Sequence, residues 1–303
     1  QDGKLKGVSW QATPGLFAYR RSIARNVLGT DDPDKVQEAL SDWNKFDKVA
    51  KMAADKNYKM ISGTGDCFKV FSNNASKRWV DDPSSESPKI QIDDKLMEWV
   101  DMCKKYHDNG WINNTAQWTE DWYADQSAAG KVFGFFYSTW GINYTLVGNA
   151  GEEGFGDWAV CEGPAAWYWG GTWIAGARGT DNASLVADIM RKLTCDKENM
   201  INITRDTQDY TNTISGMDSI AKSDFKSELL GGQNHIALFS EAAPKIDMSN
   251  AGPYDQGLCD SFQEAFGDYI VGDVDKQTAL RNFYDAAVVK FPELTYDELT
   301  LSE

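Results

Sequence analysis

Tryptophans are the side chains of this sequence whose type and spacing most clearly suggest chemistry. Within sixteen residues lie four of them and a tyrosine: Trp158, Trp167, Tyr168, Trp169 and Trp173. An indole offers a flat apolar face and one N–H donor, which suits the C–H face and the surrounding hydroxyls of a pyranose ring. Core packing is the alternative for each ring, so the cluster predicts either a carbohydrate site or a buried aromatic core. Beside other expected strand ends or loops lie Trp10, Trp79 and Trp140.

Residues for other kinds of chemistry are scarce or unspecific. The 46 acids could include the facing carboxylate pair that glycoside hydrolysis needs, but sequence alone cannot show which acids face each other. No nucleophile elbow, phosphate-binding loop or metalloprotease helix is present. The two histidines and the cysteines have no metal-ligand spacing, and the cysteines suggest free thiols without a disulfide framework. The sequence therefore predicts no catalytic residue, no metal ligand and no cofactor.

The composition is that of a folded, acidic protein. Of the 303 residues, 42% are hydrophobic and 13% aromatic, which argues against disorder. The net charge of −16 would repel phosphate backbones, so nucleic acid is excluded as a partner. No apolar run reaches the roughly 18 residues that a membrane helix needs. The chain opens with Gln1 and has no signal peptide, so we expect its natural start to be missing.

Short apolar runs alternate with amphipathic helices, which predicts an α/β architecture. Strands are expected at residues 4–10, 58–62, 131–138, 158–161 and 173–177. Asp32, Asp42 and Asp93 are expected to cap helices, and Asp181 to cap a further helix whose apolar positions run from Leu185 to Leu193. Two more helices are expected at 260–271 and 276–290, and loops at 63–66 and 81–88.

Five stretches along the chain, in order, resemble the extracellular solute-binding proteins of carbohydrate ABC importers, the family that contains maltose-binding protein. These are residues 2–8 (Asp-Gly-Lys-Leu-Lys-Gly-Val), 16–21 (Leu-Phe-Ala-Tyr-Arg-Arg), 40–46 (Leu-Ser-Asp-Trp-Asn-Lys-Phe), the Gly-Lys-Val strand at 130–140, and the Gly-Gly strand at 170–179. The resemblance covers nearly the whole chain. It implies a type II periplasmic-binding-protein fold, in which two α/β lobes close around a ligand by hinge bending.

In that family the Asp-Gly-Lys strand follows most of the first lobe, so the resemblance implies that lobe two is complete and lobe one partial. Residues 1–14 would be the end of lobe one and the first crossing, and 15–172 lobe two. Residues 173–245 would return to lobe one, and 246–303 would be C-terminal helices packing on lobe two. The returning segment would lack sheet partners, so we expect it to be helical, poorly covered or paired with a neighbouring molecule.

The resemblance also implies a role and a site. The chain would be the sugar-binding component of an ABC importer, extracellular or periplasmic, anchored as a lipoprotein in the complete protein, with an ABC transporter permease as its partner. It would bind an oligosaccharide and catalyse no reaction. The positions that would line the cleft are Trp10, Gln11, Asp66, Trp140, Thr172, Trp173, Tyr254, Asp255 and Gln256, with Arg205 and Asp209 as weaker candidates. A glycoside hydrolase and a solute-binding protein for a ligand other than sugar are the alternatives.

Overall fold

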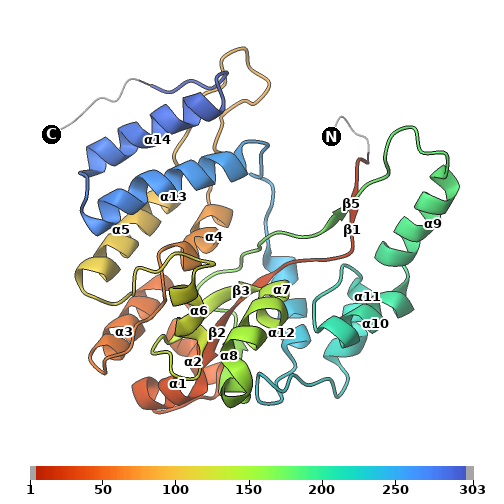
Figure 1. Cartoon of the computed structure of the whole chain (residues 1–303), viewed down its shortest axis with the longest axis horizontal. Helices are drawn as coiled ribbons and strands as arrows, with labels where there is room; N and C mark the ends of the chain where they lie inside the picture. The colour runs from red at the N-terminus through yellow and green to blue at the C-terminus, as the bar shows by residue number, and fades with distance from the viewer. Residues whose placement is uncertain (1–4, 298–303) are drawn as a thin grey trace. The chain divides into compact units, whose positions relative to one another are not determined.

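The computed structural model describes residues 5–297, which form two compact units. Unit 1 contains the chain up to Tyr58 and Tyr123–Ile246, and unit 2 contains Lys59–Trp122 and the chain from Asp247 onward. Both units are therefore built from segments that lie far apart in the sequence (Figure 1). Helix α6 (Glu120–Gln126) contains one of the boundaries. These boundaries differ from those of the expected four-part division, whose lobe assignments remain a prediction.

Unit 1 is organised around a three-stranded antiparallel sheet. The central strand is β2 (Gly15–Arg20), and it pairs with β3 (Gly134–Ser138) on one side and β4 (Trp158–Cys161) on the other. Every residue of these strands is buried, which explains why the sequence shows continuous apolar runs instead of alternation. The strands expected at 131–138 and 158–161 are confirmed, the first in shorter form.

Helices α1 (Arg21–Leu28), α2 (Pro33–Leu40) and α3 (Trp43–Ala54) follow the central strand, and α1 and α2 pack on the sheet. Asp32 and Asp42 cap α2 and α3, because their carboxylates accept hydrogen bonds from the amides of Lys35 (3.2 Å) and Lys45 (2.8 Å). Gly29 ends α1 in the left-handed region, where glycine is not strained. These caps are confirmed as the sequence predicts.

The strands expected at 4–10 and 173–177 are much shorter in the structure. Only β1 (Val8–Ser9) and β5 (Trp173–Ile174) form, as an antiparallel pair with Val8 opposite Ile174. Lys4, the first residue of the expected strand, lies outside the described residues, as do residues 2–4 of the first family-like stretch. This pair is the smallest possible sheet. Beyond it, most of residues 173–245 is helical.

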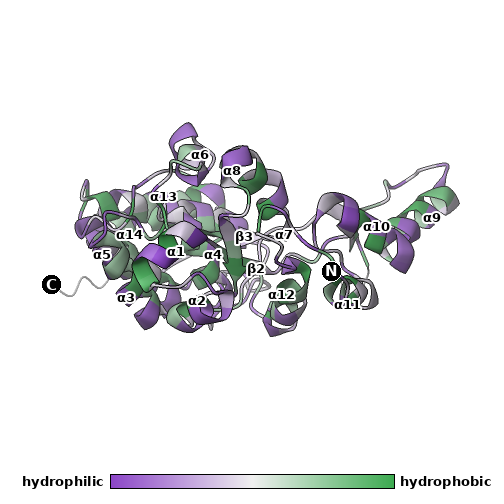
Figure 2. Ribbon diagram, turned by 90° about the horizontal axis from the view of Figure 1, so that it is seen from below, coloured by the Kyte–Doolittle hydropathy of each residue, from purple (hydrophilic) through white to green (hydrophobic). Residues whose placement is uncertain are grey.

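The helices of this segment are α9 (Ala183–Thr194), α10 (Lys197–Thr207), α11 (Ile214–Ala221) and α12 (His235–Ala242), with a 3-10 turn, η2 (Ala243–Lys245). The apolar residues of α9 stay poorly covered, as expected: Leu185 is 59% exposed and Ile189 48%. The ribbon of α9 contains both hydrophobic and hydrophilic residues (Figure 2). The expected cap of α9 is wrong. The residue before the helix is Asn182, and its side chain makes no capping hydrogen bond.

Unit 2 is a helical assembly of α4 (Gly65–Asn73), α5 (Asp94–Asp108), α13 (Asp255–Val271) and α14 (Lys276–Lys290). Its core is aromatic: Phe262 lies between Trp99 and Phe283, with ring centroids at 6.1 and 5.3 Å. Two expectations are wrong here. Residues 58–62 form only an isolated bridge between Ile61 and Ile112, and residues 65 and 66 begin α4 instead of forming a loop.

The remaining expectations for unit 2 hold more closely. Asp93 caps α5 by accepting from the amide of Lys95 at 2.8 Å. Helix α14 has the predicted bounds, whereas α13 begins five residues earlier than predicted. All five cysteines are free, and Cys195 is the exposed one. Among the described residues, no helix is both long and apolar enough to span a membrane.

His235, at the start of α12, is fully buried, and its Nε2–H donates to the carbonyl of Gln208 at 2.9 Å. Burial lowers the pKa of the imidazole from 6.5 to about 4. A group with a depressed folded pKa takes up a proton in the unfolded state first, so stability falls as pH drops below 6.5 and continues to fall until about 4. Over this window the loss is about 3 kcal/mol.

We therefore expect the free energy of unfolding of the wild type to fall relative to that of His235→Gln between pH 7 and pH 4. Urea denaturation of both proteins across this range measures the difference. Because the variant lacks the titrating ring, titrations at other positions cancel in the comparison. Parallel stability profiles would show that His235 does not titrate in this way.

Candidate functional site

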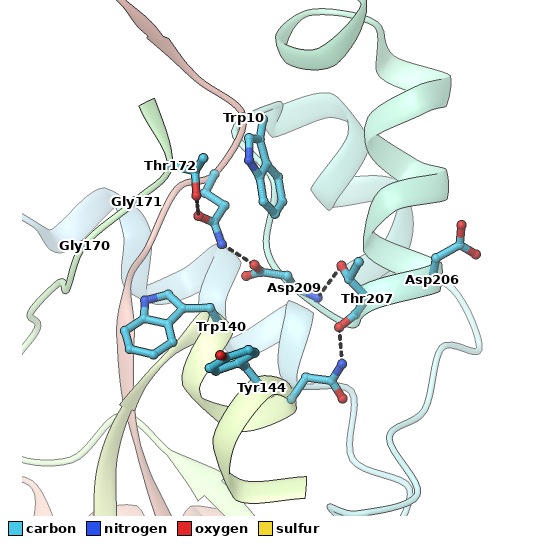
Figure 3. A pocket seen from close by; sticks show the side chains of 11 residues that line it. Trp10, Trp140, Tyr144, Gly170, Gly171, Thr172, Asp206, Thr207 and Asp209 are labelled. Carbon is cyan, nitrogen blue, oxygen red and sulfur yellow. Dashed lines mark hydrogen bonds between the residues drawn. The ribbon is translucent and has the colours of Figure 1, made fainter. Parts of the chain in front are cut away.

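Unit 1 contains a cavity of about 780 Å³, within the range of small-molecule sites in proteins. Aromatic rings and short polar side chains line it together, with two glycines where the backbone itself forms the wall (Figure 3). The lining residues are Trp10, Gln11, Trp140, Asn143, Tyr144, Gly170, Gly171, Thr172, Asp206, Thr207 and Asp209. An apolar face beside clustered hydrogen-bonding groups is the arrangement that a small polar ring requires.

Three extended segments run side by side and form the base of the cavity. Residues 9–15 occupy the middle: the amide of Gly15 donates to the carbonyl of Trp167 at 2.7 Å, and the amide of Trp169 donates to the carbonyl of Thr13 at 3.1 Å. On the other side, the amide of Asn212 donates to the carbonyl of Trp10 at 2.9 Å. The backbone ladder thus brings together groups more than 150 residues apart in the sequence.

Trp140 is held in place by a short helix and a hydrogen bond. It lies on α7 (Thr139–Gly141), directly after β3, and its Nε1–H donates to the carbonyl of Trp169 at 3.0 Å. The two indoles meet edge to face, with ring centroids 5.3 Å apart. Because its only donor is used by the protein, Trp140 can offer a ligand its apolar face alone.

The chain then forms a π-helix, η1 (Ile142–Leu146), before α8 (Val147–Gly154). A π-turn offsets side chains from normal helical spacing, and such turns often occur at functional sites. Asn143 and Tyr144 lie on this π-helix, and both line the cavity. The Asn143 side-chain amide donates to the carbonyl of Thr207, while Tyr144 is 82% exposed. Tyr144 is therefore free to contact a ligand.

A row of hydrogen bonds crosses the cavity wall. The hydroxyl of Thr172 donates to Oε1 of Gln11 at 2.8 Å, and Nε2 of Gln11 donates to Oδ2 of Asp209 (Figure 3). The amide of Tyr210 donates to Oδ1 of the same carboxylate at 2.7 Å. Burial raises the pKa of Asp209 above its ordinary value, and the hydrogen bonds oppose this shift. The row fixes the side chains of Gln11 and Thr172 in one arrangement.

Gly170 and Gly171 line the cavity directly before Thr172, and both have positive φ, at 80° and 121°. A side chain is strained in this region, and a Cβ on Gly170 would lie 3.5 Å from the indole nitrogen of Trp140. The glycine pair therefore lets the backbone pass close to Trp140 without filling the cavity.

Four of the residues singled out from the sequence meet at this cavity: Trp10, Gln11, Trp140 and Thr172. Asp209, a weaker candidate, also lines it, whereas Arg205 does not. Sequence reasoning missed Asn143, Tyr144, Asp206 and Thr207. The aromatic residues Trp140 and Tyr144 are the signal that could have pointed to residues 140–144 as part of the site. Nothing in the sequence indicates the π-helix that these residues enter.

Trp173 follows Thr172 on β5 but is 72% exposed and does not line the cavity. Three tryptophans of the original cluster or its neighbourhood serve packing or positioning instead of lining. Trp158 and Trp167 are core residues with at most 1% exposure, and Trp169 supplies the carbonyl that holds Trp140. The cluster itself therefore contributes no indole to the lining, and the two tryptophans that line the cavity, Trp10 and Trp140, lie outside it.

Asp66 lies in unit 2 and has local partners instead of a place at the cavity. Its carboxylate accepts from the amides of Ser62 (3.0 Å) and Gly63 (2.9 Å), from Nε1 of Trp122 (2.8 Å) and from Nε2 of Gln117 (3.3 Å). The side chain is 3% exposed, and burial raises its pKa to about 6. These four donors connect the turn before α4 to α6, and the part of Asp66 in ligand binding stays a prediction.

Residues 254–256 also belong to unit 2, at the start of α13. The ring of Tyr254 packs edge to face on Phe291, and the amide of Gln256 donates to Asp260 at 2.8 Å. Asp255 accepts from the amide of Gly252 at 2.9 Å. Each makes local contacts, and none of the three is among the lining residues of the cavity in unit 1. Their part in ligand binding stays a prediction.

Sequence comparison finds no matching family model and no matching curated protein. The structure, in contrast, resembles solved structures. An extracellular solute-binding protein of family 1 has a TM-score of 0.76 at 18% identity, covering 94% of this chain and 74% of that protein. An ABC-transporter-associated binding protein from B. animalis subsp. lactis, solved with β-1,6-galactobiose, gives 0.76 at 18% identity, with 98% and 76% covered.

The galacto-N-biose and lacto-N-biose I-binding protein of the ABC transporter from Bifidobacterium longum gives a TM-score of 0.71 at 15% identity, covering 97% of this chain and 71% of that protein. At this level of identity the likeness concerns the fold. The chain has the mixed α/β fold of the type II periplasmic sugar-binding proteins.

Proposed function

We propose that this chain binds an oligosaccharide in the cavity of unit 1 and is the substrate-binding component of an ABC sugar importer. The observation that carries the proposal is the cavity itself, where Trp10, Trp140 and Tyr144 surround the hydrogen-bonded row of Thr172, Gln11 and Asp209 (Figure 3). Indole faces would stack on a sugar ring, while the amide and hydroxyl groups would bond its hydroxyls. A wrong sugar would leave buried polar groups unpaired.

The fold supports the same proposal, because neighbours with this architecture were solved with galactobiose and lacto-N-biose. A binding component of this type would deliver its ligand to a permease of an ABC transporter. It would act outside the cytoplasmic membrane, and a lipid anchor on the complete protein is part of the same proposal.

Binding without catalysis is favoured over glycoside hydrolysis by the position of the two carboxylates at the cavity. Hydrolysis needs two carboxyl groups that flank the glycosidic bond. Asp206 and Asp209 both come from one stretch, the end of α10 and the loop after it, and in Figure 3 Asp206 points away from Asp209. Asp209 is also engaged by Gln11. The pair therefore lies on one wall instead of facing each other across a ligand.

Titration of the chain with a panel of disaccharides and trisaccharides, followed by tryptophan fluorescence, tests the proposal. We expect a saturable change with at least one sugar, because Trp10 and Trp140 line the cavity. Chromatography of the same samples should show no product. Release of monosaccharide would instead establish a hydrolase. Saturable binding of a compound other than sugar, with no response to any sugar, would establish a different class of ligand.

A further inference from the structure

The charge of the cavity is one-sided. Among the described residues that line it, the acidic side chains are Asp206 and Asp209, and there is no lysine, arginine or histidine. Arg205 precedes Asp206 on α10 but is not part of the lining. A ligand entering this cavity therefore meets carboxylates and neutral donors or acceptors.

Asp209 has the greater need of a compensating positive charge, because it is buried, with 5% exposure. The backbone amide of Tyr210 and Nε2 of Gln11, which donate hydrogen bonds to its carboxylate, are neutral groups. No ion pair between residues in the described part of the chain involves it. A buried carboxylate without a cation is costly, so a positive group on the ligand would compensate it.

The rest of the chain acts in the same direction at longer range. The net charge is −16, so the surface potential attracts cations and repels anions. A carboxylate on the ligand would have to approach Asp209 and Asp206 with no neighbouring cation in the cavity to receive it. A protonated amine would instead donate hydrogen bonds to these oxygens, and charge-assisted bonds of this kind are the stronger ones.

We propose that the cavity prefers an amino sugar, whose ammonium group pairs with the carboxylate of Asp209, and that it rejects uronic acids. This inference rests on the proposed carbohydrate-binding function and adds the class of sugar. Asp209 would then select the ligand in addition to orienting Gln11. If Asp209 served only to hold Gln11 in place, charge on the sugar would have no effect on binding.

Calorimetric titrations with two matched series of β-1,4-disaccharides, one glucose-based and one galactose-based, test this inference. Each series contains the neutral sugar, its 2-amino-2-deoxy form and its uronic acid form. We expect the amino form to bind about tenfold more tightly than the neutral form, and the acid form at least about tenfold more weakly. The preference for the amino form should decrease as the salt concentration is raised from about 20 mM, where the screening length is about 20 Å, because salt screens the attraction between the charges.

The Asp209→Asn variant removes the charge and keeps a group of similar shape. Its amide can accept from Tyr210, and the Gln11 amide and the Thr172 hydroxyl can reverse their donor and acceptor roles. We expect the ratio of the two dissociation constants, amino to neutral, to approach one in this variant. Asp188→Asn is the matched control, because this substitution removes the same charge outside the cavity. Asp188 lies on α9, and its side chain is 72% exposed.

The outcomes separate this inference from the function on which it rests. Binding of the neutral sugar with equal affinity for the amino form would overturn the charge preference and leave the sugar-binding function standing. An equal loss of preference in Asp188→Asn would assign the effect to net charge and overturn the role of Asp209. If 1,5-diaminopentane bound as tightly as the amino sugar, the carbohydrate function would be contradicted. If no sugar in the panel bound, both the carbohydrate function and the charge preference would be contradicted.

Discussion

Replacing Trp140 with alanine is expected to weaken oligosaccharide binding about 30-fold, because aromatic anchors of binding sites contribute roughly 2 kcal/mol or more. The ring is fixed by its hydrogen bond to the carbonyl of Trp169 and by the edge-to-face contact with that indole, so it loses little freedom when a ligand stacks on it. Trp140→Phe keeps a flat apolar face and should retain part of the affinity. Fluorescence of the remaining tryptophans or calorimetry measures the change.

The matched control is Phe155→Ala, which removes an aromatic ring of unit 1 that is 40% exposed and outside the cavity lining. Its affinity for the same sugar should stay near that of the wild type. Equal affinity of Trp140→Ala and the wild type, with a sugar that binds the wild type well, would remove Trp140 from the site.

Substitution of Gly15 by alanine should damage both stability and binding. A Cβ at this position would lie 2.0 Å from the indole of Trp167, which is 1% exposed and cannot move aside without disturbing the core. Overpacking of this kind costs about 3 kcal/mol. The segment that carries Trp167 continues into Gly170, Gly171 and Thr172, which line the cavity, so displacement of Trp167 should move the cavity wall as well.

Thermal and urea denaturation measure the stability loss, and a sugar titration at a temperature where the variant is folded measures the binding loss. Gly148→Ala is the control, because a Cβ there meets no atom within 4 Å and the residue lies in α8. That variant should equal or exceed the wild type in stability by up to about 1 kcal/mol. A Gly15→Ala protein as stable as the wild type would show that the strand and the Trp167 segment are less tightly packed than the structure indicates.

Local signals in the sequence predict the helix starts well, because an aspartate cap depends on neighbouring residues alone. Asp32, Asp42 and Asp93 are correct for this reason, whereas Asp181 is wrong by one residue and Asn182 makes no cap. Strands depend on partners elsewhere in the chain. The expected strand at 58–62 has a single bridge to Ile112, and an apolar run without a partner strand does not form a sheet.

The candidate site was predictable where it rests on residue type and unpredictable where it rests on backbone geometry. Trp10, Trp140 and Thr172 could be chosen from aromatic character, glycine neighbours and the family resemblance. Asn143 and Thr207 reach the cavity through the π-turn and the end of α10, which have no sequence signal that we recognise. Asp66, which the sequence offered as a ligand contact, instead has four local N–H donors in unit 2, and its part in ligand binding stays a prediction.

Sugar binding in the cavity of unit 1 is tested most directly by the ¹H–¹⁵N spectrum of the indole groups during titration with an oligosaccharide that binds. Assignments come from single Trp→Phe substitutions. We predict that the indole signals of Trp10 and Trp140 shift with the same saturation curve, since both rings line the cavity. The signal of Trp99, whose Nε1–H donates to the carbonyl of Thr64 in unit 2, should stay in place. Saturable sugar binding that leaves the Trp10 and Trp140 signals unchanged would place the ligand elsewhere and contradict binding in this cavity.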